Sequence, residues 1–167
     1  MILLVNDAGI LIDLLKADLI TPFFQLEYEF HVTDFVVAEV QEDNAYQLET
    51  FVSAGRLSKK TFDFDELLEI QRLELQHKSL SIPDCSCLYL SAQLSATLLT
   101  GDSALKRIAV QQKIPVHGFL WVIDELVNHR LISKNTAYEK LQYICSFNSR
   151  LPFDECSMRL AKWKKGR

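Results

Sequence analysis

Four carboxylates stand where an α/β chain commonly builds a site. Asp7 follows the first predicted strand, Asp102 follows a strand predicted over 96–100, Glu39 lies in the first turns after the second strand, and Asp84 lies in the first turn of a helix. Ligands of open α/β sheets bind outside the carboxyl ends of the strands, so we expect these acids to converge there. Because carboxylates at one edge repel one another, Mg²⁺ or Mn²⁺ is the natural neutraliser. The spacing predicts a divalent-cation site.

Each acid also has a purely structural interpretation. Asp7 and Asp102 are of the residue type that caps the amino end of a following helix. Asp84 in a first helical turn complements the helix dipole, and Glu39 is interpretable as a solvated helix residue. Taken singly, these interpretations are the simpler ones. The joint placement of the four acids favours the site.

The elements that must position these acids alternate between strands and helices. Apolar runs and period-two patterns predict strands over 2–5, 30–33, 57–62, 96–100 and 114–117. Helical spacing runs from Ile10 to Leu19 and recurs over 36–40, 44–54, 64–75, from 81 and over 103–112. It also covers most of the chain after Leu120, with Pro152 breaking it before a last helix. The pattern predicts an α/β three-layer sandwich, with a central parallel sheet of four or five strands and helices on both faces.

Size and composition bound the organisation. The chain has 167 residues, of which 49% are hydrophobic, and its net charge is −4. We expect one domain over 1–147 with a helical C-terminal extension over 148–167. An acidic balance argues against a simple nucleic-acid-binding module, although a cation held by carboxylates can still meet phosphate. The four cysteines lack zinc spacing and are expected to be buried or idle thiols.

Several segments, in order and spacing, resemble the PIN-domain family and its VapC-like toxin ribonucleases. They read LLVNDAGILIDLLK, DFVVAEV, SIPDCSCLYLSAQLSATLLTGDSALKRIA and IPVHGFLWVIDELVNHRLIS. The likeness covers most of residues 1–132 and is weak between about 45 and 78. It matches the metal-site acids of the family to Asp7, Glu39, Asp84 and, within Thr100-Gly101-Asp102, Asp102. The chain departs from the common pattern at Ala8-Gly9 and Ser103, where many members carry further hydroxyl or acidic residues, so one metal is easier to defend than two.

The resemblance implies a divalent-metal-dependent endoribonuclease that hydrolyses RNA phosphodiesters with water. Asp7 and Asp102 would hold Mg²⁺ or Mn²⁺. Glu39 or Asp84 would complete the coordination through water or act as general base, and the sequence leaves that choice open.

Substrate contacts are less clearly encoded than the acids. Lys106 and Arg107, after Asp102, are the basic residues best placed to meet phosphate, and Ser103 is placed to reach a bound water. The simpler interpretation of each is an ordinary exposed or capping residue of a helix. The C-terminal run 158–167 carries five basic residues and Trp163, a combination that suits single-stranded RNA or, alternatively, an ordinary solvated helix.

The family analogy also suggests partners. Small PIN-like proteins are often toxins paired with an antitoxin protein and are commonly homodimers. The apolar helices 62–75 and 120–131 are candidate interfaces, although core burial explains them equally well. No signal peptide or membrane span is recognisable, so we expect a cytoplasmic protein.

Two other interpretations stay open. One is a catalytically inactive PIN-like scaffold or binding protein. The other is a haloacid-dehalogenase-like or receiver-like phosphotransfer domain, although Gly9 occupies the position where the former needs a second Asp. The WVIDELV segment is expected to turn Asp124 and Glu125 towards solvent.

Overall fold

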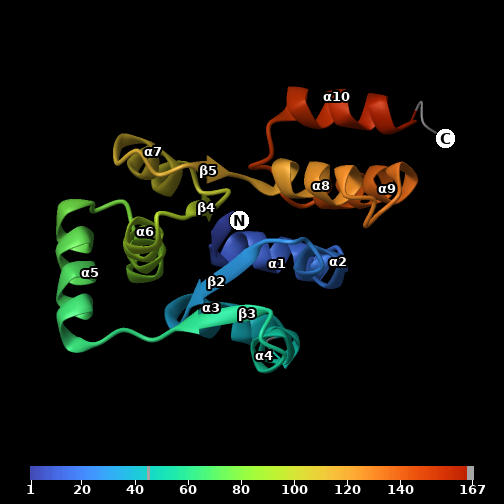
Figure 1. Cartoon of the computed structure of the whole chain (residues 1–167). Helices are drawn as coiled ribbons and strands as arrows, with labels where there is room; N and C mark the ends of the chain where they lie inside the picture. Colours follow the sequence, from blue (N-terminus) through green and yellow to red (C-terminus); the bar gives the residue numbers. More distant parts are fainter. Residues whose placement is uncertain (45, 165–167) are drawn as a thin grey trace.

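A parallel five-stranded sheet forms the centre of the computed structural model, which describes residues 1–44 and 46–164 (Figure 1). The strands are β1 (Leu3–Asn6), β2 (Glu29–Thr33), β3 (Leu57–Lys60), β4 (Thr97–Leu99) and β5 (Val116–His117). They pair in the order β3-β2-β1-β4-β5. The central strand β1 carries Leu4 and Val5, both fully buried, as expected for a strand covered on both faces. The predicted three-layer fold with a parallel sheet is confirmed.

The helices cover both faces of this sheet. They are α1 (Ala8–Lys16), α2 (Ile20–Phe24), α3 (Asp34–Asn44), α4 (Tyr46–Ser53), α5 (Phe64–Gln76), α6 (Ile82–Leu94), α7 (Ser103–Gln111), α8 (Phe119–Asn128), α9 (Lys134–Cys145) and α10 (Phe153–Lys164). Right-handed crossovers place α1 to α4 on one face and α5 to α7 on the other. Figure 1 shows α5 and α6 across the sheet from α1 and α2, and α6 contacts β1, β2 and β4.

Helices α1 and α7 begin within a few residues of the ends of β1 and β4, and capping side chains mark the starts of α1, α6 and α7. The side chains of Asp7 and Asp102 accept hydrogen bonds from backbone N–H groups at the starts of α1 and α7. Ser81 and Asp84 form a reciprocal capping box at the start of α6. These caps fix where each helix begins, because they satisfy N–H groups that have no partner inside the helix. The chain therefore turns from strand to helix at one edge of the sheet.

Some element boundaries differ from the sequence prediction. The strand predicted over 57–62 ends at Lys60, since Phe62 turns into the core and Asp63 caps α5. The helical pattern after Leu120 divides into α8 and α9, because Ser133 caps a new helix. The helix predicted over 44–54 is observed as α4, and residue 45 lies outside the described residues.

The remaining expectations concern cysteines, membrane spans and domain boundaries. Cys85, Cys87 and Cys156 are buried and all four cysteines are free, as predicted. Among residues 1–44 and 46–164, no helix is both long enough and apolar enough to cross a membrane. Helix α10 packs on α9, and the predicted boundary between 147 and 148 stays a prediction.

Candidate active site

Asp7 lies at the carboxyl end of the central strand and is 7% exposed. Its backbone N–H donates to the Leu99 carbonyl at 3.0 Å, which holds the residue beside β4. Oδ1 accepts from the Ala8 N–H at 2.7 Å, and Oδ2 accepts from the Thr100 hydroxyl at 2.7 Å. Both carboxylate oxygens are therefore oriented by short hydrogen bonds, and the side chain is fixed in a nearly dry position.

Thr100 links two of the predicted acids. Its hydroxyl donates to Asp7 and also accepts the Asp102 backbone N–H at 3.0 Å. The side chain of Asp102 in turn accepts from the Leu105 N–H at 2.8 Å, so this carboxylate is half-buried at the start of α7. Sequence reasoning identified Thr100 only as a member of the T-G-D element and missed its hydroxyl. The signal available was a hydroxyl residue at a strand end, two positions before an acid.

Asp84 and Glu39 approach the same edge from the other side of β1. Asp84 Oδ2 accepts the Ser81 N–H at 2.9 Å, while the Asp84 N–H donates to the Ser81 hydroxyl at 3.2 Å. Glu39 lies on the exposed part of α3. Partial desolvation and the charge of Asp84 nevertheless raise the pKa of Glu39. The two side chains therefore share one electrostatic environment.

The pKa of Asp7 depends on the charges of Asp84 and Glu39. Burial raises the pKa of the Asp7 carboxyl from 3.8 to about 6, the hydrogen bonds from Thr100 and Ala8 oppose this rise, and the charges of Asp84 and Glu39 add to it. The buried Cys87 thiol is affected by the same three acids, and its pKa is raised well above 9.0, mainly by burial. Asp7, Asp84 and Glu39 thus form one coupled group, which an added positive charge would stabilise.

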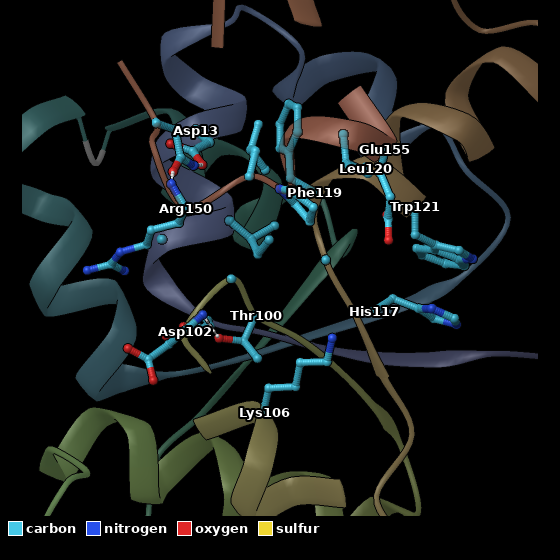
Figure 2. Close-up of a pocket in the computed structure, with 18 of the residues that line it drawn as sticks. Asp13, Thr100, Asp102, Lys106, His117, Phe119, Leu120, Trp121, Arg150 and Glu155 are labelled. Carbon is cyan, nitrogen blue, oxygen red and sulfur yellow. Dashed lines mark hydrogen bonds between the residues drawn. The ribbon is translucent and has the colours of Figure 1, made fainter. Parts of the chain in front are cut away.

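A cavity of about 630 Å³ opens beside Asp7, and neither Asp84 nor Glu39 is among its lining residues. Thr100 and Asp102 line one side, while α8, α10 and the segment 147–152 line the other (Figure 2), and Asp7 is also a lining residue. Cationic side chains on its wall are Lys16, Lys106, Arg150 and Arg159. The acids therefore border a space large enough for a ligand.

The residues predicted to bind substrate differ in whether they line this cavity. Lys106 lines it, whereas Arg107 and Ser103 do not. The C-terminal run is not an aromatic platform, since Trp163 is 2% exposed and belongs to the core, and residues 165–167 lie outside the described residues. Of the basic residues singled out in the sequence, Lys106 lines this wall, and so does Arg159 from the C-terminal run.

Asp124 and Glu125 differ from the prediction that they face solvent. Asp124 receives hydrogen bonds from Arg159 Nε at 2.9 and 3.1 Å and from Nη2 at 2.7 Å. Glu125 accepts a hydrogen bond from the Tyr28 hydroxyl. Both acids are half-buried and tie α8 to distant segments, which its local sequence pattern could not reveal.

Two buried oxygen atoms at neighbouring strand ends have no hydrogen-bond partner in the described structure. They are Oδ1 of Asn6, at the end of β1, and Oδ1 of Asp34, directly after β2. The amide group of Asn6 is fixed by donating to the His31 carbonyl at 3.0 Å. Sequence reasoning did not select Asp34, although it too is an acid that follows a strand.

The donor set suits a hydrated hard cation. Within residues 1–44 and 46–164, no group of three or more His, Cys, Asp or Glu side chains is gathered closely enough to hold a metal ion. Zinc normally requires three or four protein ligands, whereas Mg²⁺ keeps several waters and uses one or two carboxylates. The oxygen atoms of Asp7 and Asp102, bordering one cavity and joined through Thr100, fit the second kind of site.

Comparison with known proteins agrees with this fold. The chain matches a family described as a PIN domain over residues 3–165. No curated protein matches it.

Proposed function

The chain belongs to the PIN-domain family, which has a nuclease fold, and we propose that it is a divalent-metal-dependent endoribonuclease. The observation that carries the proposal is Asp7: a buried carboxylate at the central strand end, fixed by Thr100, lining a cavity and repelled by two further acids. Burying a carboxylate costs stability unless the charge is compensated. A buried carboxylate with a perturbed pKa in a cavity is therefore typical of a functional site.

The residues divide the chemistry between them. Asp7 and Asp102 would hold Mg²⁺ or Mn²⁺, which when bound polarises a phosphoryl oxygen and lowers the pKa of a water towards neutrality. Lys106, on the same cavity wall, supports the phosphate by charge. Glu39 or Asp84 orients the attacking water or accepts its proton, and the raised pKa of Glu39 suits that role.

Cleavage of a labelled mixed RNA pool tests the proposal. Full-length protein is incubated with Mn²⁺, Mg²⁺ or EDTA, beside Asp7→Asn and the matched control Asp65→Asn, which changes an exposed acid on α5. We expect cleavage that requires metal, disappears in Asp7→Asn and survives in Asp65→Asn. Cleavage that persists in Asp7→Asn would overturn the assignment.

Metal binding supplies a readout independent of activity. We expect Mn²⁺, followed by electron paramagnetic resonance, to bind the wild type and Asp65→Asn more tightly than Asp7→Asn. Binding equal in all three proteins would contradict the cation site. The absence of both metal binding and cleavage would instead favour the inactive PIN-like scaffold.

The proposal includes a biological role as the toxin of a toxin–antitoxin pair, on the family analogy. Expression of the chain in bacterial cells should arrest growth, and Asp7→Asn should relieve the arrest. Unchanged growth with wild-type protein present would count against a toxin. An antitoxin that covers the acidic edge should restore growth when it is co-expressed.

Self-association is proposed through α5, on which Phe64 is 72% exposed and Leu75 is 62% exposed. Leu67 and Leu68 extend this apolar face. The other predicted interface, 120–131, is largely core, because Leu120, Val122, Ile123 and Leu126 are buried. Light scattering on wild type and Leu75→Glu should show a dimer that the charge disrupts.

A further inference from the structure

Three aromatic rings form a column at one side of the cavity. The rings of Tyr28 and Trp121 stack at a centroid distance of 6.0 Å and an angle of 22°, and those of Trp121 and His117 at 4.3 Å and 4°. Tyr28 and Trp121 are half-buried, whereas His117 is exposed. The imidazole is the outer end of the column, and its face opposite Trp121 has no aromatic partner among the described residues. His117 and Trp121 both line the cavity (Figure 2).

Hydrogen bonds hold this column in place. The Tyr28 hydroxyl donates to Glu125, one helical turn beyond Trp121 on α8. The backbone carbonyl of His117 accepts the Thr100 N–H at 3.0 Å, so the ring is carried by the strand beside Thr100. A platform fixed before binding loses little conformational freedom when a ligand arrives.

The column lies at a fixed place relative to the acids. Asp7, Thr100 and His117 end or follow the adjacent strands β1, β4 and β5. Neighbouring strands are about 4.8 Å apart, so the backbones of β1 and β5, which carry Asp7 and His117 at their ends, are separated by roughly 10 Å across the sheet edge. One nucleotide can span that separation from its phosphate to its base. In Figure 2 the Lys106 side chain lies between Thr100 and His117, where it can meet the phosphate.

We infer that the outer face of His117 is a stacking subsite for an unpaired base of single-stranded RNA whose phosphate lies at Asp7 and Asp102. This inference rests on the proposed ribonuclease function and specifies its substrate class. Every base has a π-face, so stacking on a protein ring tolerates sequence but requires a base that can leave its neighbours. A regular duplex offers no such base.

The electrostatics of the imidazole agree with a stacking role. Partial desolvation of the ring, one face of which is covered by Trp121, lowers the pKa of His117 below its ordinary value, against the opposing charge of Glu125. The ring is therefore neutral at neutral pH and contributes a flat aromatic surface. The phosphate is met by Lys106 instead, and the two recognition tasks are separated along the cavity wall.

The test measures RNA binding in Mg²⁺ by full-length protein in the Glu39→Gln/Asp84→Asn background, which removes both candidate general bases and keeps Asp7 and Asp102. The probes are a fluorescent 12-nucleotide single strand of mixed sequence and its blunt duplex. The variants add His117→Ala, His117→Phe or the control His77→Ala, which changes a histidine outside the cavity lining. Circular dichroism confirms that each variant is folded.

We expect His117→Ala to weaken single-strand binding by about tenfold, as loss of one base–aromatic contact does. His117→Phe should keep most of the affinity, His77→Ala should keep all of it, and duplex binding should be weaker than single-strand binding throughout. The inference is overturned if Ala and Phe weaken binding equally, if His117→Ala matches His77→Ala, or if the single strand does not bind. Wild-type cleavage is measured separately, so a failed nuclease assay with His117-dependent binding rejects the chemistry and retains the subsite.

Discussion

The hydroxyl of Thr100 donates a 2.7 Å hydrogen bond to Oδ2 of Asp7, joining residues 93 positions apart in the chain. The same oxygen accepts the Asp102 N–H at 3.0 Å. One buried side chain therefore sets the positions of two acids on neighbouring strand ends. The capping interactions of Asp7 and Asp102 do not compete with a catalytic role, since each cap uses one oxygen and thereby orients the other.

Thr100→Val should raise the pKa of Asp7 above about 6, because the lost hydrogen bond stabilised the ionised carboxylate. The acid limb of the cleavage profile should move to higher pH. The Asp102 N–H also loses its acceptor, so the free energy of unfolding should fall by about 1–3 kcal/mol. Thr100→Ser keeps the hydroxyl and should restore both properties, as measured by pH-rate profiles and urea unfolding. An unchanged profile in the Val variant would contradict the role of the hydroxyl.

Asp7→Asn should change the pH dependence of stability. Folding raises the pKa of Asp7 from 3.8 to about 6, so the folded state favours the protonated carboxyl. This contribution is fully present below about pH 4 and is lost as pH rises through about 6. The variant carries no such proton and should gain up to ~3 kcal/mol relative to wild type between pH 4 and 7. Urea unfolding of both proteins in EDTA at several pH values measures this difference in the free energy of unfolding. A difference that stays the same at every pH would refute the effect of burial on the pKa of Asp7.

Asp84→Asn should lower the pKa of Asp7, and Glu39→Gln should lower it by less. The charge of Asp84 contributes more to the raised pKa of Asp7 than the charge of Glu39 does. Carbon-13 NMR of the aspartate carboxyl groups follows this titration directly. Asp65→Asn is the control, and it should leave the Asp7 titration in place. If Asp7 titrates in Asp84→Asn and in Glu39→Gln as it does in wild type, the charges of Asp84 and Glu39 do not affect its pKa.

Arg159→Lys should loosen the C-terminal helix from α8. The guanidinium of Arg159 contacts both oxygens of Asp124, and the two side chains are 21% and 32% exposed. Lysine cannot make this forked contact with both carboxylate oxygens, so we expect the free energy of unfolding to fall by about 1 kcal/mol. We also expect proteases to cleave the segment 147–152 faster. Arg72→Lys, in the exposed pair with Glu69, should cost almost nothing. Equal effects of the two changes would show that the fork adds no stability.

The sequence by itself determined the alternation of elements and the edge at which the acids gather. The apolar run 2–5 indicates a strand buried on both faces, and Asp7 follows it after Asn6. Parallel strands end on one side, so the positions of Asp7 and Asp102 followed from local pattern alone. The start of α6 at Ser81 was also readable, because a capping box and a first-turn proline are local signals.

Only the tertiary structure decided which side chains meet. The Thr100–Asp7 bond, the Arg159–Asp124 fork and the stack of His117 on Trp121 depend on the pairing of strands and on where α8 and α10 pack. Trp163, which the sequence offered as a platform for RNA bases, lies in the core because of how α10 packs. Local periodicity shows which face of an element is apolar, but long-range packing determines what that face touches.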